Sequence, residues 1–483
     1  MNEVKLLIGG HQVAARSGVT FERRNPVSGA VVTRAAAAQA ADAMAAADAA
    51  AAALPAWSAL APGARRAKLN CAADLFEARA SDIAAAVRDE TGATAGWGHF
   101  NVHFAASLLR EAASLTTQIG GEVIPSDVPG SFAMSYRQPV GVVLGIAPWN
   151  APVILGVRAI AMPLACGNSV ILKSSEVCPA THAFIGSVLE EAGLGAGVIN
   201  VLSTDVKDAE AVAESLIGHR AIRRINFTGS TRVGRILAQV AARHLKPILL
   251  ELGGKAPLIV LADADIDAAV DATVFGAYAN AGQICMSTER VIIERSVADT
   301  FAAKLAKRVA ALPVGNPNEG EFVIGSVVGV ATVERIKRLM DDAEKQGAKV
   351  LTGGKTNGTI MSGIVVDHVT PKMALFREES FGPQVSITRV DSADEAVRLA
   401  NDSDYGLSAS VFTRDLARGL DIARRIESGI CHVNAPTVHD EAQMPFGGVK
   451  DSGYGRFGGK AGIDAFTELR WITVQTAPRH YPF

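Results

Sequence analysis

Hydrophobic and polar positions divide the first part of the chain into short alternating runs followed by longer stretches with helical spacing. Residues 6–34 contain the alternating runs and predict strands joined by turns. Helical stretches follow at about 37–54, 61–90 and 94–118. Pro55, Pro62 and Gly92 stand where such helices stop and start. The pattern therefore predicts several strands and then three long helices.

From residue 140 onward, apolar β-branched runs alternate with helical stretches. The runs lie at 140–146, 169–173, 198–202 and 223–227, and the helical stretches at about 152–164, 179–191, 206–217 and 230–243. This alternation predicts a doubly wound α/β fold, a parallel sheet wrapped by helices that binds dinucleotides at the carboxyl ends of its strands. A second block begins at 257–261 and continues through helices near 265–280, 296–311 and 331–346. It predicts a second α/β domain.

The segment 120–139 has neither pattern. Its sequence, GEVIPSDVPGSFAMSYRQP from Gly121, has a proline-rich tip and alternating ends. These features predict a hairpin that leaves its domain, with an ordinary surface hairpin as the alternative. Residues 470–475 near the C-terminus also have the pattern of a strand.

Composition indicates a soluble protein of two or three domains, because 483 residues exceed one ordinary domain. Net charge is 47 − 49 = −2 with both signs dispersed, so no basic stripe favours nucleic acid. No apolar span is long enough for a membrane, and no charged-then-apolar leader opens the chain. We expect a cytoplasmic protein without a membrane or nucleic-acid partner.

The cysteines and histidines give no metal pattern. Five cysteines occur without paired spacing, which favours a reduced protein. His99 and His103 lie four residues apart on a predicted helix, but no glutamate follows the first, as a zinc protease would require. We expect both histidines to be structural and no metal to be bound.

One glutamate and one cysteine are candidates for covalent chemistry. Glu251 follows an apolar run and precedes two glycines, and Cys285 follows a Gly-Gln-Ile loop 285 − 251 = 34 residues later. A thiol is strongly nucleophilic once deprotonated, and an apolar setting raises the pKa of a carboxylate into the range of a general base. Spacing alone leaves open that the cysteine is a buried apolar residue and that the glycines form a turn.

Several further motifs surround this pair, in a fixed order along nearly the whole chain. They are IAPWN at 146–150, KSSE at 173–176, FTGSTRVG at 227–234, ELGGK at 251–255, GQIC ending at Cys285, EESFGP at 378–383 and PFGG at 445–448. The set resembles the aldehyde dehydrogenase superfamily, and within it the bacterial branch that acts on aromatic aldehydes.

The resemblance implies a division of the chain. Its NAD-binding domain would comprise 1–119 and 140–250, and its catalytic domain 251–430. Residues 120–139 and 465–483 would be oligomerisation elements of a homodimer or homotetramer, and 431–464 would return to the first domain. Glu468 would lie near the subunit contact in a structural role.

The resemblance also implies a mechanism. Cys285 would attack the aldehyde carbon, and the side-chain amide of Asn150 with the backbone N–H of Cys285 would hold the oxyanion. Glu251 would activate water to hydrolyse the thioester. Relatives that pass the acyl group to coenzyme A generally lack this glutamate, so its presence favours the free acid.

The cofactor implied by the resemblance is NAD, although the three-glycine GxGxxG turn is missing. Gly229 and Ser230 open a predicted helix, whose N-terminus suits a phosphate. Glu176 beside a ribose would repel the extra phosphate of NADP. The full predicted cofactor set is Ile146, Trp149, Lys173, Glu176, Gly229, Ser230, Leu252, Glu379 and Phe381.

The predicted substrate residues are Trp97, Arg158, Ile284 and Met286, with the loop 437–439. Arg158 would hold a substrate oxygen or form a structural ion pair. Many family members have a second glutamate and a lysine as a proton relay, but Phe457 and Ala159 stand at those positions here. In these two positions and in Arg158 the sequence resembles the bacterial branch that acts on aromatic aldehydes. Salicylaldehyde is therefore the expected substrate, with benzaldehyde, vanillin or aliphatic aldehydes as alternatives.

Two other classes of function remain to be weighed. A cysteine hydrolase would use Cys431 and His432, but neighbouring residues on a strand face opposite sides. A binding protein without catalysis is the second alternative.

Overall fold

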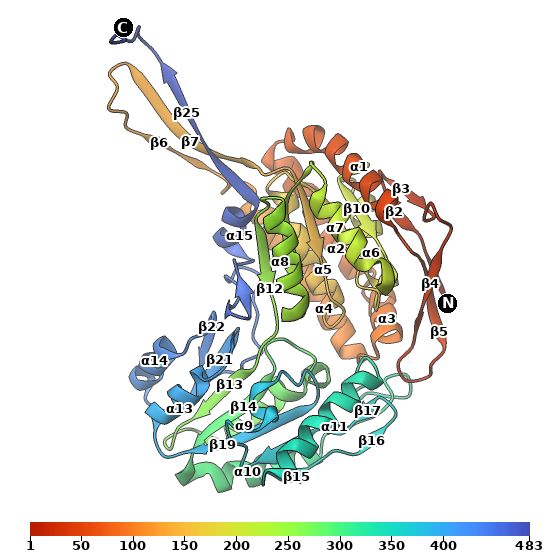
Figure 1. Ribbon diagram of the computed structural model, residues 1–483, viewed down its shortest axis with the longest axis vertical. Coiled ribbons are helices and arrows are strands. Elements are labelled where there is room, and N and C mark those ends of the chain that lie inside the picture. Colours follow the sequence, from red (N-terminus) through yellow and green to blue (C-terminus); the bar gives the residue numbers. More distant parts are fainter.

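Three sheets organise the computed structural model, which describes residues 1–483. In Figure 1 an eight-stranded sheet lies in the upper body, a seven-stranded sheet lies in the lower body, and a three-stranded sheet extends from the upper body as an arm. The two larger sheets carry the doubly wound α/β architecture that the alternating pattern predicts. No helix combines the length and the apolar character needed to span a lipid bilayer.

The eight-stranded sheet is parallel through its centre. Its order is β24 (Gly453–Tyr454), β12 (Ile248–Glu251), β11 (Ile222–Thr228), β8 (Val142–Ile146), β9 (Ser169–Lys173), β10 (Ile199–Leu202), β2 (Leu6–Ile8) and β3 (His11–Val13). The strands from β12 to β10 run parallel. Val143 and Val170 face one apolar core, while Leu144 and Ile171 face another. Because both faces are buried, β8 and β9 are mostly hydrophobic, whereas β11 also contains Arg223, Arg224 and Asn226.

Helices cover both faces of this sheet. One core contains α1 (Ala40–Ser58), α7 (Ala209–Gly218) and α8 (Thr231–Arg243). The opposite core contains α2 (Pro62–Ala78), α3 (Ala80–Thr91), α4 (Ala95–Leu115), α5 (Pro152–Ala165) and α6 (Pro179–Glu191). The carboxyl ends of β8, β9, β11 and β12 therefore open at one edge, between the two helical layers.

The seven-stranded sheet follows the same principle. Its order is β15 (Lys349–Thr352), β18 (Ile364–Asp367), β19 (Gln384–Val390), β14 (Thr288–Glu294), β13 (Ala256–Val260), β21 (Ser408–Phe412) and β22 (Ile430–Val433). All but β15 run parallel. Its helices are α9 (Ile266–Tyr278), α10 (Arg295–Ala310), α11 (Val330–Lys345), α12 (Ala374–Arg377), α13 (Ala393–Asn401) and α14 (Leu416–Arg425). A separate apolar core fills this unit.

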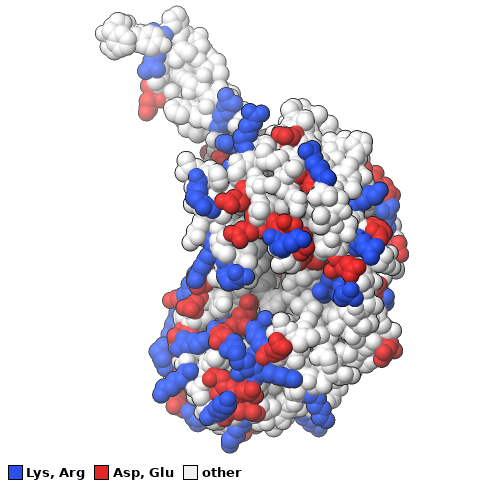
Figure 2. All heavy atoms as spheres, turned by 45° about the vertical axis from the view of Figure 1, so that its right-hand side comes forward, with Lys and Arg blue, Asp and Glu red and all other residues white.

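The arm combines the 120–139 hairpin with the end of the chain. Its strands are β6 (Gly121–Ile124), β7 (Ser131–Pro139) and β25 (Thr467–Gln475), which follows α15 (Gly459–Phe466). Figure 2 shows that most of the arm surface is uncharged. The exposed apolar side chains of Val123, Phe132, Leu469, Trp471 and Val474 lie there.

The remaining strands form small ribbons. They are β1 (Asn2–Val4), β5 (Val31–Ala36) and β4 (Thr20–Arg24) in one sheet, with the pairs β16 (Thr356–Asn357) and β17 (Ile360–Met361), and β20 (Tyr405–Gly406) and β23 (Val449–Lys450).

Two predictions of local structure were wrong. The stretch 61–90 is two helices, because the backbone of Arg79 (φ −105°, ψ 16°) leaves the helical region where its guanidinium pairs with Glu191. Pro55 does not stop the first helix, which continues to Ser58. Its last turn is anchored by Trp57, whose buried indole N–H donates to the carbonyl of Leu164 at 3.1 Å.

Candidate active site

Cys285 lies where two cavities meet. One has a volume of about 270 Å³ and a mostly apolar lining, and the other has about 670 Å³ and a polar lining. Asn150, Leu155 and Cys285 line both. Figure 2 shows a recess between the upper and lower bodies. The thiol can therefore be approached from two sides, by two different ligands.

The loop that presents Cys285 has an unusual backbone. It begins with a short 3₁₀ helix, η2 (Ala279–Gly282), in which Asn280 and Ala281 have φ of 49° and 54°. Such left-handed residues are uncommon outside glycine and cluster at functional sites. Gly282 has φ 69°, and an added Cβ would lie 2.2 Å from the Gly382 carbonyl oxygen. The backbone N–H of Cys285 makes no hydrogen bond within the chain and is free to bind an oxyanion.

Asn150 is fixed beside this loop. Its Nδ2 donates to the carbonyl of Gln283 at 3.0 Å. Its own carbonyl accepts from Trp97 Nε1 and from Asn280 Nδ2, each at 2.9 Å. An amide nitrogen carries two hydrogens, so one remains after the bond to Gln283. The side chain can therefore offer a second donor to a ligand at the thiol.

Glu251 is the last residue of β12 and lines the larger cavity with Cys285. Its side chain is buried, and neither carboxylate oxygen has a hydrogen-bond partner. Burial raises the pKa of Glu251 to about 8, partly offset by Cys285 and Arg158. Burial, and then the neighbouring Glu251 charge, also raises the pKa of Cys285 well above its usual value. An unpartnered buried carboxylate of raised pKa is suited to take a proton from water.

The larger cavity also contains an anion-binding end. Gly229 and Ser230 connect β11 to α8, and Ser230 caps that helix by accepting from the N–H of Val233 at 3.4 Å. The first N–H groups of a helix lack intrahelical partners and attract anions. Arg232 lines the same end and adds a positive charge. This part of the cavity can hold a phosphate.

At the other end of the cavity are two aromatic rings and a carboxylate. Trp149 and Phe381 meet edge to face with centroids 5.8 Å apart. Glu379 accepts from the N–H of Gly254 at 2.8 Å, and burial together with the charge of Glu289 raises its pKa to about 7. Leu252 also lines the cavity. These groups can hold a flat ring and a hydroxylated ligand.

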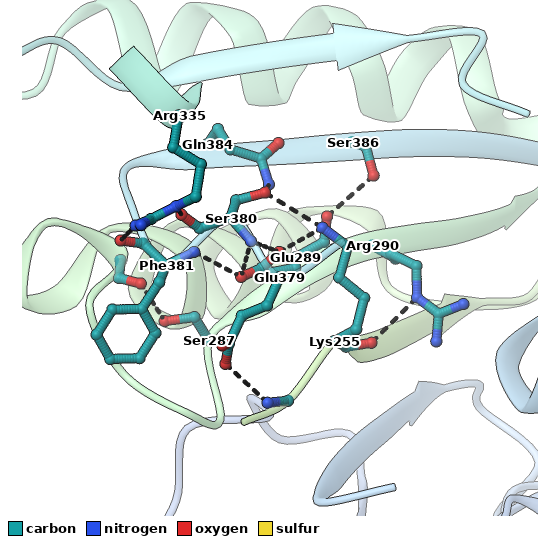
Figure 3. A network of polar contacts seen from close by, with 12 residues as sticks. Lys255, Ser287, Glu289, Arg290, Arg335, Glu379, Ser380, Phe381, Gln384 and Ser386 are labelled. Atoms are coloured by element: carbon teal, nitrogen blue, oxygen red, sulfur yellow. Dashed lines mark hydrogen bonds and ion pairs between the residues drawn. The ribbon is translucent and has the colours of Figure 1, made fainter. Parts of the chain in front are cut away.

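A buried network, drawn in Figure 3, holds the loop that carries Glu379 and Phe381. Glu289 accepts from the backbone N–H of Ser380 at 2.9 Å and of Phe381 at 3.0 Å, and pairs with Lys255. Phe381 has φ 47°, a conformation that this network maintains. Sequence motifs gave no indication of Glu289.

Three predicted cofactor residues lie beside the larger cavity and do not line it. Ile146 and Lys173 are paired at the carboxyl ends of β8 and β9. Lys173 is buried, and its Nζ donates to the carbonyl of Ser174 at 3.2 Å. Glu176 is half-buried in the turn after β9. The sheet topology thus places all three at the strand edge from which the cavity opens.

The smaller cavity brings together all four predicted substrate residues, Trp97, Arg158, Ile284 and Met286. Val438 and His439 of the predicted loop also line it, whereas Thr437 is buried and donates to the carbonyl of Met286 at 2.7 Å. Arg158 pairs with Asp440. Sequence reasoning missed Asp440 and two phenylalanines of α4, Phe100 and Phe104. Trp97, Phe100 and Phe104 have helical i, i+3, i+7 spacing, which could have revealed one lining face.

The other candidate groups do not form sites. No group of three or more potential metal ligands is present. His103 lies 3.9 Å from Glu77, as a surface pair. Cys431 and His432 lie on β22, where burial raises the pKa of Cys431 to about 11 and lowers that of His432 to about 4. Glu468 of the arm strand β25 forms an ion pair with Arg224 of β11 in the eight-stranded sheet.

Comparison with known proteins decides the family. A protein-family model described as "Aldehyde dehydrogenase family" matches residues 13–472 of the sequence. The chain belongs to the aldehyde dehydrogenase family. It is therefore an oxidoreductase that acts on aldehydes, and the family's cofactor is NAD. The predicted fold class is confirmed with it.

Individual relatives cover the whole chain. A vanillin dehydrogenase of Pseudomonas sp. (strain HR199) is 60% identical over 482 residues, 100% of both proteins. A solved structure of a salicylaldehyde dehydrogenase from Pseudomonas putida G7, complexed with salicylaldehyde, has a TM-score of 0.98 and 48% identity and covers 100% of both chains. The solved PnpE structure in complex with nicotinamide adenine dinucleotide has a TM-score of 0.95 and 34% identity, with 99% of each chain covered.

Proposed function

We propose that this aldehyde dehydrogenase oxidises an aromatic aldehyde to its carboxylic acid, with Cys285 as the nucleophile and Glu251 as the base for hydrolysis. The observation that carries the proposal is the position of Cys285 between an apolar cavity and the cavity that contains Glu251. The apolar cavity suits a ring, because Trp97, Ile284 and Met286 line it.

The residues around the larger cavity fit NAD. The start of α8 and Arg232 suit the pyrophosphate, Trp149 and Phe381 suit the nicotinamide, and Glu379 suits a ribose hydroxyl. Glu176 and Lys173, at the end of β9, would bind the adenosine ribose. The positions of Ile146 and Leu252 at strand ends support the same assignment.

The reaction begins when the Cys285 thiol gives its proton to the neighbouring Glu251 carboxylate and its sulfur forms a bond to the aldehyde carbon, while the electron pair of the C=O π bond moves to the oxygen. The second hydrogen of Asn150 Nδ2 and the free N–H of Cys285 stabilise the oxyanion. NAD held in the larger cavity would supply the hydride acceptor: the C–H bond of the former aldehyde carbon would lose its hydride, and the acyl group would stay on the Cys285 sulfur as a thioester.

Glu251 then takes a proton from water, which attacks the thioester and releases the acid. The position usual for the family's second glutamate is occupied by Phe457, and that of the lysine by Ala159, and both are buried and apolar. Neither residue can carry a proton. We therefore infer that the proton released by Glu251 leaves through water in the polar cavity or by another route.

Hydroxylated benzaldehydes are the proposed substrates. Vanillin and salicylaldehyde both belong to this group, and relatives named for each match the chain over its full length. Salicylaldehyde is the substrate predicted from sequence. The chain is 60% identical to a vanillin dehydrogenase and 49% identical to a salicylaldehyde dehydrogenase, so vanillin is the main alternative substrate.

The arm supports a proposed homodimer or homotetramer. Trp471 is 77% exposed and Leu469 is 61% exposed, on a sheet that is mostly uncharged. Such a patch typically marks a subunit contact. Light scattering of the purified protein measures its oligomeric state, and a monomer would contradict the proposal.

We place the enzyme in the cytoplasm, and fractionation of cells tests that location.

An aldehyde panel tests the function. Purified protein is mixed with NAD and vanillin, salicylaldehyde, benzaldehyde or hexanal, and NADH and the acid are measured. We expect the aromatic aldehydes to have the higher kcat/KM. Cys285→Ala should reduce turnover on the order of 10⁴-fold or more. Cys71→Ala, at an exposed cysteine of α2, is the matched control and should retain activity. Equal activity of both variants would contradict the assignment of the nucleophile.

A further inference from the structure

Asp440 places a carboxylate oxygen without a partner beside the aldehyde cavity. Its Oδ2 pairs with Arg158, while Oδ1 is buried and accepts no hydrogen bond. Both residues line the cavity that also contains Cys285. Buried polar atoms are nearly always hydrogen-bonded, and no side chain donates to this oxygen, so it can accept a hydrogen bond from a ligand.

Arg158 holds Asp440 in place. Its guanidinium carbon lies 4.4 Å from the centroid of the Phe446 ring and 6.0 Å from that of Phe104. These cation–π contacts fix the guanidinium between two rings. Its side chain is 5% exposed, and that of Asp440 is 14% exposed. The carboxylate therefore cannot readily turn outward to water.

The rest of the cavity offers few alternatives for polar recognition. Arg158 and Asp440 are the only lysine, arginine, aspartate or glutamate residues that line it. His439 also lines the cavity, but its Nε2 pairs with Glu441 at 3.0 Å. Asn150 and Cys285 belong to the reacting end. One acceptor next to an apolar wall suits a ring that carries a single hydrogen-bond donor.

We propose that Asp440 is a specificity-determining residue whose Oδ1 accepts a hydrogen bond from a phenolic hydroxyl of the aldehyde substrate. This inference rests on the proposed function and adds the group that selects hydroxylated rings. The positive charge of Arg158 is already matched by Asp440, so the pair favours a neutral phenol over a phenolate. Arg158 then acts through Asp440, as a positioning residue.

The test compares hydroxylated aldehydes with their methyl ethers. A methoxy group fills similar space and accepts hydrogen bonds but cannot donate them. For wild-type protein we expect kcat/KM for para- or ortho-hydroxybenzaldehyde to exceed that for the matching methoxybenzaldehyde by roughly 10–100-fold, since a site built to bind a hydroxyl discriminates strongly. The ring position with the larger ratio shows whether the site is built for a vanillin-like or a salicylaldehyde-like substrate.

Asp440→Asn is the decisive variant. Its amide oxygen can keep the contact with Arg158, which leaves an NH₂ donor where Oδ1 stood. We therefore expect the preference for hydroxyl to disappear or to reverse toward methoxy, while kcat/KM for benzaldehyde falls by a clearly smaller factor than that for the hydroxylated ring. Glu441→Gln is the matched control, because this half-exposed neighbour does not line the cavity.

The outcomes are distinguishable. Equal losses of Asp440→Asn on hydroxylated and plain rings would assign Asp440 a structural role and overturn the inference, while leaving the proposed function intact. An unchanged hydroxyl-to-methoxy ratio in Asp440→Asn would also overturn it. Absence of NADH formation by wild-type protein with every aldehyde would contradict the proposed function itself. A Glu441→Gln variant that shifts the ratio as much as Asp440→Asn would likewise overturn the role of Asp440.

Discussion

Lys255 and Glu289 form a buried ion pair, with side chains 0% and 4% exposed. Lys255 lies 255 − 251 = 4 residues after Glu251, and Glu289 lies 289 − 285 = 4 residues after Cys285. The pair therefore joins the two segments that carry the proposed base and nucleophile. Glu289 also binds the backbone of the Glu379–Phe381 loop, so one contact fixes three parts of the site.

Removing one member of this pair should destabilise the fold. For Glu289→Ala we expect a loss of about 3–5 kcal/mol in the free energy of unfolding, because the Lys255 ammonium would remain buried without a counter-charge and with only Ser380 Oγ as a hydrogen-bond partner. KM for NAD should rise, since the loop loses its anchor. Chemical denaturation and steady-state kinetics measure both. The double variant Lys255→Met/Glu289→Leu should recover part of the stability, and additive losses would contradict the coupling.

The pH profile of turnover should report on Glu251. Its pKa is raised to about 8 by burial, and the ionised form is the base. Thioester hydrolysis is therefore expected to increase with pH up to about 8 and to level off above it. Glu251→Gln should form the acyl-enzyme in a burst of NADH and then stall. Rapid-mixing kinetics measure this, and normal steady-state turnover of the variant would exclude Glu251 as the base.

The same carboxylate should reduce the stability of the folded protein. An unfolded glutamate has a pKa of about 4.3, and the folded value is raised to about 8. Between these values the unfolded chain binds fewer protons, so the contribution of Glu251 to stability decreases as pH rises. Glu251→Gln should thus gain stability over wild type at pH 8 and show little gain at pH 4. Melting curves at both pH values measure the difference.

Asn150→Ala should slow the formation of the thioester. Loss of one oxyanion donor reduces such a step by about 10²–10³-fold. The burst rate of NADH measures it, with hydrolysis affected less. A melting temperature close to that of wild type would show that the loop around Gln283 is retained. An unchanged burst rate would assign oxyanion stabilisation to the Cys285 N–H alone.

Glu176 should select NAD over NADP. A carboxylate at the end of β9 would repel the additional phosphate of NADP. For Glu176→Gln we expect kcat/KM with NADP to increase roughly tenfold while that with NAD falls, because charge repulsion is lost together with an acceptor. Steady-state kinetics with both cofactors measure the ratio. A constant ratio would remove Glu176 from cofactor selection.

The sheets could be predicted because most of their strands are buried on both faces and are therefore rich in apolar, β-branched residues. The break at Arg79 could not, because no glycine or proline marks it and the ion pair with Glu191 is a contact between distant helices. Local pattern carries no information on such pairs. The same reason explains why Pro55 predicts a helix end although packing of Trp57 extends the helix.

For the site, continuous motifs indicated Glu251, Cys285 and Asn150, and the fold brings the three to one junction, where their roles remain predictions. The sequence does not predict Asp440 and Glu289 as site residues, because each contacts partners that are far away in the sequence. Arg158 precedes Asp440 by 440 − 158 = 282 residues. Only the packing of α5 against the segment after β22 makes them neighbours.

The cavities for the aldehyde and for NAD have only Asn150, Leu155 and Cys285 in common. Random libraries confined to the apolar side, with these three positions held constant, would leave the nucleotide site chemically intact. A single ancestral scaffold could in this way diversify toward new aldehydes while its redox machinery stayed the same.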